Sequence, residues 1–170
     1  MLSNITITDI KETFTVFSPK GRFEKIQNRK SYALSFCDKG QITYTHNGNE
    51  IISDKNHAII LPQGQSYTLC GDKTGSFAVI NFTCAEPLCD TIVSFPIENS
   101  DIYITDFERI RSLSLFGTDR AEIMSIFYHM LHRISVQNSS SEVIMPAIKY
   151  LENNYHNPNL TNTELAKQCQ

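Results

Sequence analysis

The chain has 170 residues, of which 41% are hydrophobic and 19% charged, a balance that suits a globular protein with its own core. The formal net charge is −3, so the overall basic excess that favours nucleic acids is absent. No apolar run reaches the roughly 18 residues of a membrane span, and the N-terminus lacks the apolar stretch of a secretory signal. The five cysteines include no Cys-x-x-Cys pair, which favours reduced thiols and a cytoplasmic location.

Short runs typical of β-strands fill the chain up to about residue 100. These runs are 1–17, 31–37, 41–46, 49–53, 58–61 and 77–82. The first is either an edge strand or a loose arm. Asn47-Gly48 joins two neighbouring runs, and this dipeptide is a strong signal for a tight hairpin. Asp38-Lys39-Gly40 and the segment 71–75 are expected to be turns.

The run 58–61 is the centre of this β unit. It is apolar at every position, which suits a strand covered on both faces. Pro62 ends the strand because proline has no N–H to donate, and Gly64 can take the positive φ of a turn. A new strand then begins at Tyr67. The order of these runs predicts a compact antiparallel arrangement.

The spacing within this unit resembles the two cupin motifs, Gly-x5-His-x-His and Gly-x5-Pro-x-Gly-x2-His. The positions that match are Gly40, His46, Pro62 and Gly64. The positions that depart are Gly48, Asn56 and Tyr67, which stand where the motifs have histidine, glycine and histidine. The resemblance implies a cupin-like antiparallel β-barrel. Because one motif histidine remains, where an open metal site needs at least three ligands, we expect no metal and no other cofactor.

Beyond residue 100 the apolar period changes from two to 3.6, which predicts helices. Thr105 has capping-box spacing to a glutamate, and the first helix is expected over about 105–116, with Gly117 as its stop. Asp119 opens a second helix, 119–136, in the same way.

The apolar stripe of this second helix is broad enough to cover the barrel and leave a strip for a partner. We therefore expect a homodimer. The interface residues are predicted to be Met124, Phe127, Tyr128 and Leu131. The alternative is that the whole stripe belongs to the core of one domain.

The polar run 137–141 is expected to be a linker between a first domain, 1–136, and a segment, 142–170, with two further helix signals. In that segment Thr161 and Glu164 form a capping box that marks a helix start.

Residues 147–169 resemble the start of the DNA-binding domain of AraC/XylS-family transcription regulators. The matching residues are Tyr150, Leu151, Glu152, Asn154, Tyr155, Leu160, Thr161, Leu165 and Ala166. In that family a cupin-like sensor barrel, a helix pair and two helix-turn-helix motifs follow one another. The recognition helix, which would enter the major groove, is not among these residues. We therefore expect a sensor fragment that reaches DNA only through the missing part of a longer protein.

The family resemblance also implies an effector pocket inside the barrel. The candidate ligand-binding residues are Lys25, Tyr44, His46, Tyr67, Leu69, Phe77, Val79 and Asn81. In the basic segment 19–30, one cation is expected to face the cavity and meet an anionic ligand group, although a solvated strand is the alternative. For His46 the alternative is a hairpin-end histidine, and for Asn81 an amide satisfied by the backbone.

The predicted fold class is mainly β with C-terminal helices: a cupin-like barrel (jelly roll), an antiparallel helix pair and the first helices of a helix-turn-helix domain. The predicted function is a sensor domain that binds a small effector, dimerises and controls attached DNA-binding domains. It is not expected to be an enzyme, because no nucleophile pattern or phosphate loop is present. The alternative is a metal-dependent cupin isomerase or oxygenase.

Overall fold

The structure is a computed structural model, and it describes residues 2–98, 100–116, 119–139, 145–154, 156 and 160–167. The chain divides into two compact units, Met1–Ser135 and Val136–Gln170. None of the described helices combines the length and the apolar character that a membrane span requires.

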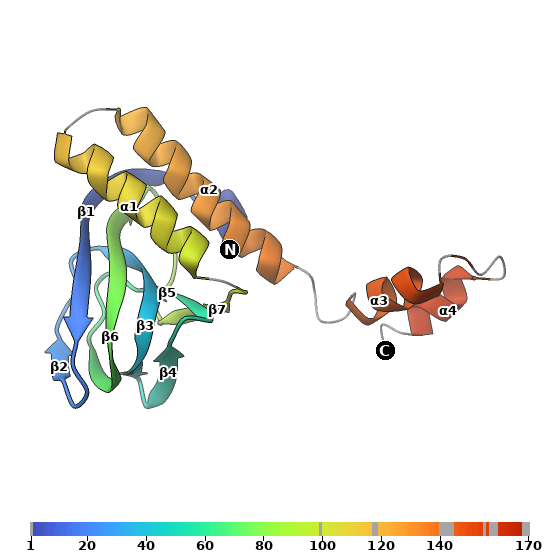
Figure 1. Ribbon diagram of the computed structural model, residues 1–170, viewed down its shortest axis with the longest axis horizontal. Coiled ribbons are helices and arrows are strands. Elements are labelled where there is room, and N and C mark those ends of the chain that lie inside the picture. The colour runs from blue at the N-terminus through green and yellow to red at the C-terminus, as the bar shows by residue number, and fades with distance from the viewer. Residues whose placement is uncertain are drawn as a thin grey trace. The chain divides into compact units, whose positions relative to one another are not determined.

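The first unit consists of a curled antiparallel sheet and two helices (Figure 1). A short 3-10 turn, Leu2–Asn4, precedes the sheet. The strands are β1 (Ile7–Ser18), β2 (Phe23–Ile26), β3 (Tyr32–His46), β4 (Asn49–Ser53), β5 (His57–Leu61), β6 (Tyr67–Cys84) and β7 (Val93–Pro96). The helices are α1 (Asp101–Phe116) and α2 (Arg120–Ser139). The predicted fold class, mainly antiparallel β of the jelly-roll kind with C-terminal helices, is confirmed.

The two long strands β3 and β6 organise the sheet. Its order is β1-β6-β3-β5-β7, and β2 and β4 are added to β6 and β3. β6 pairs with β2 through residues 67–70 and with β1 through residues 75–84. β3 pairs with β5 through residues 33–36 and with β4 through residues 42–46. Each long strand therefore belongs to both halves of the jelly roll, and the sheet curls where they bend.

The bend lies where turns were expected, and those two predictions are wrong. The pairing of β3 with β6 shifts register between Cys37 and Ile42. Gly40 has a φ of 99°, and a Cβ atom on it would lie 2.6 Å from the Cα atom of Gly75. The two backbones thus touch at a point where only glycine fits. The sequence alone does not distinguish a glycine at which a strand bends from a glycine at which a strand ends.

Other local predictions are confirmed. Asn47 and Gly48 have φ values of 52° and 80°, as a tight hairpin turn between β3 and β4 requires. Gly64 also has a positive φ, of 78°. The run 58–61 is a buried strand within β5. The first strand is an edge strand, β1, which resolves the choice between a strand and a loose arm.

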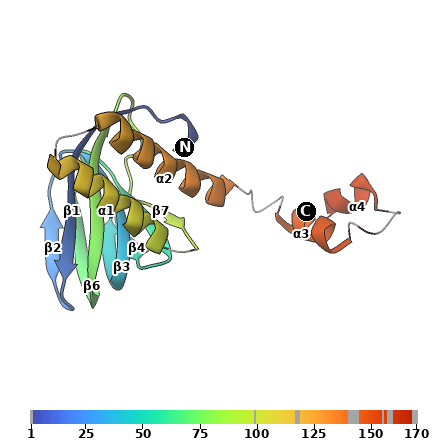
Figure 2. The ribbon, with the colours of Figure 1, turned by 45° about the horizontal axis from the view of Figure 1, so that its top comes forward.

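Two apolar clusters cover the two faces of the sheet. One lies inside the curl of the sheet and includes Tyr44, Phe77 and Val79. The other lies between the outer face and the helices and includes Ile80 and Phe82. Successive residues of β6 thus alternate between the two clusters, as strand geometry requires. Figures 1 and 2 show α1 and α2 side by side across this outer face.

The helix boundaries differ from the predicted ones. α1 begins at Asp101, one turn before Thr105, because the backbone oxygen of buried Ser100 accepts hydrogen bonds from the Tyr103 and Ile104 amides. The cap of α2 is confirmed, since the Asp119 carboxylate accepts a 3.1 Å hydrogen bond from the Glu122 amide. α2 continues to Ser139, so residues 137–139 are helical where a linker was expected. The rest of that linker, 140–141, and Gly117 lie outside the described residues.

The second unit contains α3 (Met145–Asn154) and α4 (Asn162–Lys167). The capping box before α4 is confirmed. The Thr161 amide donates to the Glu164 carboxylate at 3.1 Å, and the Glu164 amide donates to the Thr161 hydroxyl at 3.3 Å. Tyr155, one of the residues that match the AraC/XylS pattern, lies outside the described residues.

Candidate functional site

A cavity of about 200 Å³ lies within the curled sheet. Most of its wall is apolar or aromatic, and three charged side chains, Arg22, Glu24 and Arg29, complete it. The apolar residues that were not predicted are Phe14, Val16, Ile26, Ile42 and Leu61. A mainly apolar wall with a few polar groups is typical of small-molecule sites.

Five of the eight predicted ligand-binding residues line this cavity. They are Tyr44, Tyr67, Leu69, Phe77 and Val79. All five come from β3 and β6, where residues two apart share a face. Alternation predicted which residues share a face, and the family resemblance predicted that this face is the inner one.

Lys25 does not line the cavity, so its prediction is wrong. Lys25 is exposed, whereas its neighbours Glu24 and Ile26 are partly buried and line the cavity. The error has a simple origin. Phe23 and Ile26 are the first and last residues of the short strand β2, and their side chains lie on opposite faces. The apolar pattern of this strand therefore cannot say which face is inside. The structure leaves Phe23 67% exposed.

His46 is also placed away from the cavity. It lies at the end of β3 opposite Asn49, is only 3% exposed, and is not one of the lining residues. Its Nε2 atom is buried and has no hydrogen-bond partner among the described residues. In the same described part of the chain, no three His, Cys, Asp or Glu side chains are grouped so that they could hold a metal ion.

Arg29 is the group around which the site is built. Its Nη1 atom donates to the Tyr67 hydroxyl at 3.1 Å, and its Nη2 atom donates to the Asn81 Oδ1 atom at 2.5 Å. Its Nε atom is buried without a hydrogen-bond partner among the described residues. Arg29 forms no ion pair with any described carboxylate. Among the described residues, the Arg29 guanidinium is therefore hydrogen-bonded to neutral oxygens and not to a carboxylate. Its Nε–H group is buried and remains available as a donor.

Arg22 is a useful contrast because it lines the same cavity. Its Nε and Nη2 atoms donate to the Glu24 carboxylate at 3.0 and 2.6 Å, and its Nη1 atom donates to the Phe17 carbonyl at 3.0 Å. The charge of Arg22 is thus balanced within the protein. Of the two guanidinium groups at the cavity, Arg29 is the one available to a ligand anion.

The two tyrosines supply neutral donors. Burial raises the pKa of Tyr44 and of Tyr67, and the Arg29 guanidinium opposes this rise in the pKa of Tyr67 without cancelling it. Both phenols therefore remain protonated at physiological pH. Their rings meet edge to face, with centroids 5.8 Å apart. The Tyr67 oxygen accepts from Arg29, so its own proton is free to donate to a ligand oxygen.

Asn81 does not line the cavity, but it belongs to the same site. It lines an outer groove of about 580 Å³ with Lys11, Glu12 and Lys30. The groove and the cavity share Arg29 in their walls. Asn81 holds Arg29 through its Oδ1 atom, and its Nδ2 atom donates to the Glu12 carboxylate at 3.1 Å. The structure thus places Asn81 against Arg29 and not in the wall of the cavity.

Sequence reasoning flagged the basic segment 19–30 but selected the wrong cation. The backbone of Arg29 is held by the Gly64 turn: its amide donates to the Gln65 carbonyl at 3.0 Å, and its carbonyl accepts from the Gly64 amide at 2.7 Å. Asn28, just before it, has a φ of 44°. These long-range contacts turn Arg29 toward the cavity, and no periodic pattern in the segment reveals them.

The predicted dimer residues divide into two kinds. Phe127 and Leu131 are 0% and 1% exposed and pack in the cluster between the sheet and the helices, so they belong to the core of the unit. Met124 is partly buried against the same cluster. Tyr128 is 37% exposed, and its hydroxyl accepts a hydrogen bond from the Ile7 amide. The alternative, in which the apolar stripe of α2 packs within one domain, thus agrees with the burial of Phe127 and Leu131.

No protein-family model and no curated protein sequence matches this chain. Solved structures do match it. ToxT from Vibrio cholerae strain SCE256 with a bound unsaturated fatty acid is 10% identical, with a TM-score of 0.53 over 95% of this chain and 69% of that one. ToxT from Vibrio cholerae O395 bound to (E)-4-(8-methylnaphthalen-1-yl)but-3-enoic acid is 12% identical, with a TM-score of 0.52 over 92% and 70%.

The AraC-like transcriptional activator CuxR is also similar, at 10% identity and a TM-score of 0.49, over 92% of this chain and 65% of that one. At identities this low, similarity establishes the fold and not the ligand. The chain therefore has the fold of ToxT over most of its length.

Proposed function

We propose that this chain is the sensor region of an AraC-type transcription regulator and that its barrel binds a small carboxylic acid with an apolar body. The observation that carries the proposal is Arg29, a guanidinium with a free buried donor at the edge of an apolar cavity. The fold shared with ToxT and the resemblance of residues 147–169 to the AraC/XylS pattern support the regulatory role.

The chemistry of the cavity favours such a ligand on two counts. A carboxylate on Arg29 gains charge-assisted hydrogen bonds, each worth about 1.5–3 kcal/mol. An apolar body in the cavity gains about 0.8 kcal/mol for each methylene removed from water. The ligands named in the two ToxT structures, an unsaturated fatty acid and an aryl butenoic acid, belong to the same chemical class.

The test compares decanoate with decanol on the wild-type chain and two variants, by isothermal titration calorimetry. Decanoate is expected to bind at least tenfold more tightly than decanol. Arg29→Met should remove this preference, because it deletes the charge and keeps much of the apolar bulk. Lys25→Met is the matched control, since Lys25 is a cation of the same segment that faces away from the cavity. Equal affinities for the acid and the alcohol in the wild type would contradict the proposal.

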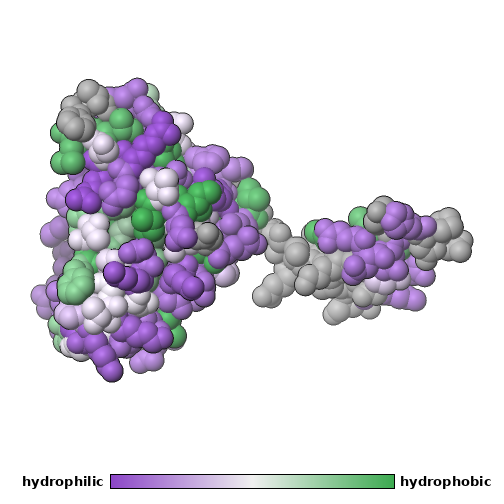
Figure 3. Space-filling model, viewed as in Figure 1, coloured by the Kyte–Doolittle hydropathy of each residue, from purple (hydrophilic) through white to green (hydrophobic). Residues whose placement is uncertain are grey.

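In the proposed mechanism, ligand binding shifts the populations of two arrangements of the sensor, and attached helix-turn-helix domains respond. The regulator acts as a homodimer through the exposed side of α1 and α2. Hydrophilic residues cover most of the face in Figure 3, and hydrophobic groups on the first unit are small and separate. An interface there needs individual exposed side chains, such as Leu115 and Tyr128.

Sedimentation equilibrium of the full chain tests this association. A dimer is expected, and Leu115→Glu should weaken it at least tenfold, because it places a charge in an apolar contact. A monomer at all concentrations would refute the dimer and leave the ligand proposal intact.

A further inference from the structure

Strand β1 forms part of the wall of three hollows in the first unit. Phe14 lines both the cavity and the outer groove. Lys11 and Glu12 line both the outer groove and a third hollow of about 300 Å³, which is also bounded by residues of α1 and α2. A displacement of β1 would therefore change the walls of the ligand cavity and of the hollow beside the helices at the same time.

The middle of β1, at Glu12, is tied to Arg29. Asn81 on β6 lies directly opposite Glu12 in the strand pairing. Its Oδ1 atom accepts from Arg29 at 2.5 Å, and its Nδ2 atom donates to the Glu12 carboxylate at 3.1 Å. The Asn81 amide thus bridges the cation of the site to a carboxylate on β1.

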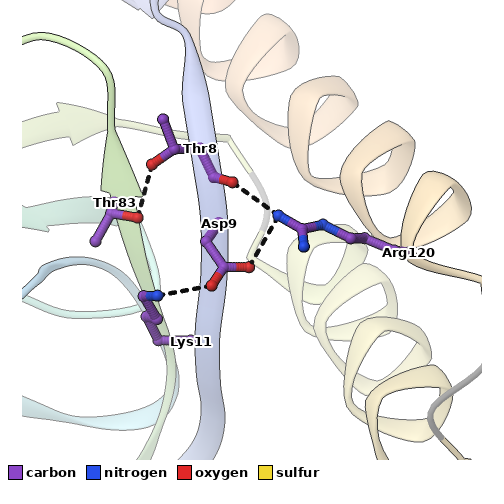
Figure 4. A network of polar contacts seen from close by, with 5 residues as sticks. All are labelled: Thr8, Asp9, Lys11, Thr83 and Arg120. Carbon is purple, nitrogen blue, oxygen red and sulfur yellow. Dashed lines mark hydrogen bonds and ion pairs between the residues drawn. The ribbon is translucent and has the colours of Figure 1, made fainter.

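The helix-side end of β1 is tied to α2 (Figure 4). Arg120, at the start of α2, pairs with the Asp9 carboxylate at 3.2 Å and donates to the Thr8 carbonyl at 2.8 Å. Lys11 also pairs with Asp9, at 2.7 Å. Eight residues further along α2, the Tyr128 hydroxyl accepts a hydrogen bond from the Ile7 amide at 2.7 Å.

Along this part of β1 its pairing with β6 is irregular. Its register shifts between Ile7 and Asp9 and again between Ile10 and Glu12. Such irregularities disrupt the ladder of hydrogen bonds and allow a strand to bend. One of these irregularities, between Ile10 and Glu12, lies in the stretch that joins the ligand side to the helix side.

We infer that β1 transmits occupancy of the ligand site to α2 through the contacts Arg29–Asn81–Glu12 and Asp9–Arg120. A ligand carboxylate on Arg29 competes with Asn81 for the guanidinium donors. The Asn81 amide is then free to turn, its hold on Glu12 weakens, and β1 shifts relative to α2. This inference rests on the proposed function, because it assigns the regulation of the same site.

The test follows hydrogen exchange of the Ile7 amide by NMR on the full chain, with and without saturating decanoate. In the wild type, decanoate is expected to speed this exchange roughly fivefold, because β1 loosens from Tyr128. Glu12→Ala should abolish the response at saturation. Glu12 is exposed, so its removal spares the core. Thr83→Val is the matched control, since it deletes another β1–β6 side-chain hydrogen bond, Thr8–Thr83, and should keep the response.

A second arm needs no ligand. Arg29→Met removes the grip on Asn81 directly, and it should speed exchange of the Ile7 amide by a similar factor in the absence of decanoate. If decanoate binds and Ile7 exchange stays unchanged, or if Glu12→Ala responds like the wild type, the inference is overturned while the proposed function stands. If decanoate fails to bind, the proposed function fails, and the Arg29→Met arm alone decides the relay: unchanged exchange there overturns it.

Discussion

At the scale of single residues, the site is explained by how charges are partnered. Arg22 and Arg29 line the same cavity. Glu24 pairs with Arg22, whereas the side-chain partners of Arg29 among the described residues are the neutral oxygens of Tyr67 and Asn81. A ligand anion gains most at the cation that is not already neutralised. Under the proposed function, the difference between two arginines seven residues apart sets the place and the polarity of the ligand.

The buried tyrosines predict how stability depends on pH. Burial raises the pKa of Tyr44 and of Tyr67 above the ordinary value of 10.0, so the folded state holds these protons longer than the unfolded state. Their contribution to the free energy of unfolding is complete below about pH 10 and is lost as pH rises above it. Urea unfolding between pH 8 and pH 11 measures this loss. Tyr44→Phe should reduce the slope of the free energy of unfolding against pH. An unchanged slope would show that other groups cause it.

Cysteine reactivity gives a second prediction at this scale. Burial raises the pKa of Cys37 to about 12, and the side chain is fully buried, whereas Cys70 is exposed. The thiolate is the reactive form, so iodoacetamide at pH 8 should label Cys70 quickly and spare Cys37. Peptide mass spectrometry checks the order, and addition of urea should make both reactive. Early labelling of Cys37 in the native protein would contradict its burial.

At the scale of elements, the bends of β3 and β6 shape the cavity. Both strands change direction where Gly40 and Gly75 touch, and both carry cavity residues beyond the bend. A straight strand would leave these side chains on a flat sheet. The close approach of β3 and β6 at this point therefore depends on two glycines that no turn requires.

Gly75→Ala should destabilise the protein strongly, because a Cβ atom there meets the backbone of Lys39 and Gly40. Overpacking against backbone is expected to cost about 3 kcal/mol. Gly48→Ala is the control. Gly48 has a φ of 80° but open space around it, so only backbone strain of about 1–2 kcal/mol applies. Urea denaturation of both variants tests the order, and equal losses would contradict the close approach.

At the scale of the whole molecule, the first unit contains every buried hydrophobic residue in the part of the chain that the structure describes. The buried hydrophobic residues run from Leu2 to Ile134, and both apolar clusters lie within this range. α2 is essential to one of them, through Phe127, Met130 and Leu131. The first unit is thus expected to fold without the helices that follow it.

A fragment of residues 1–139 should unfold cooperatively, with a midpoint within a few degrees of the full chain, and should bind decanoate equally well. A fragment of residues 1–119 lacks α2 and exposes the outer face of the sheet, so it should not fold cooperatively. Circular dichroism melts distinguish the two. A full-chain midpoint well above that of the longer fragment would show that α3 and α4 stabilise the sensor.

The sequence by itself determined the features that obey local rules. The Asn47-Gly48 hairpin, the buried strand ended by Pro62, the alternation of Phe77 and Val79 and the capping box at Thr161 each depend on neighbours a few residues away. Only the tertiary structure decided which cation faces the cavity, which glycines bend a strand rather than end it, and which side of α2 is buried. Those outcomes depend on contacts between Arg29 and Gly64, between Gly40 and Gly75, and between Phe127 and the sheet. Residues so far apart in sequence leave no periodic signal, because their geometry exists only once the chain has folded.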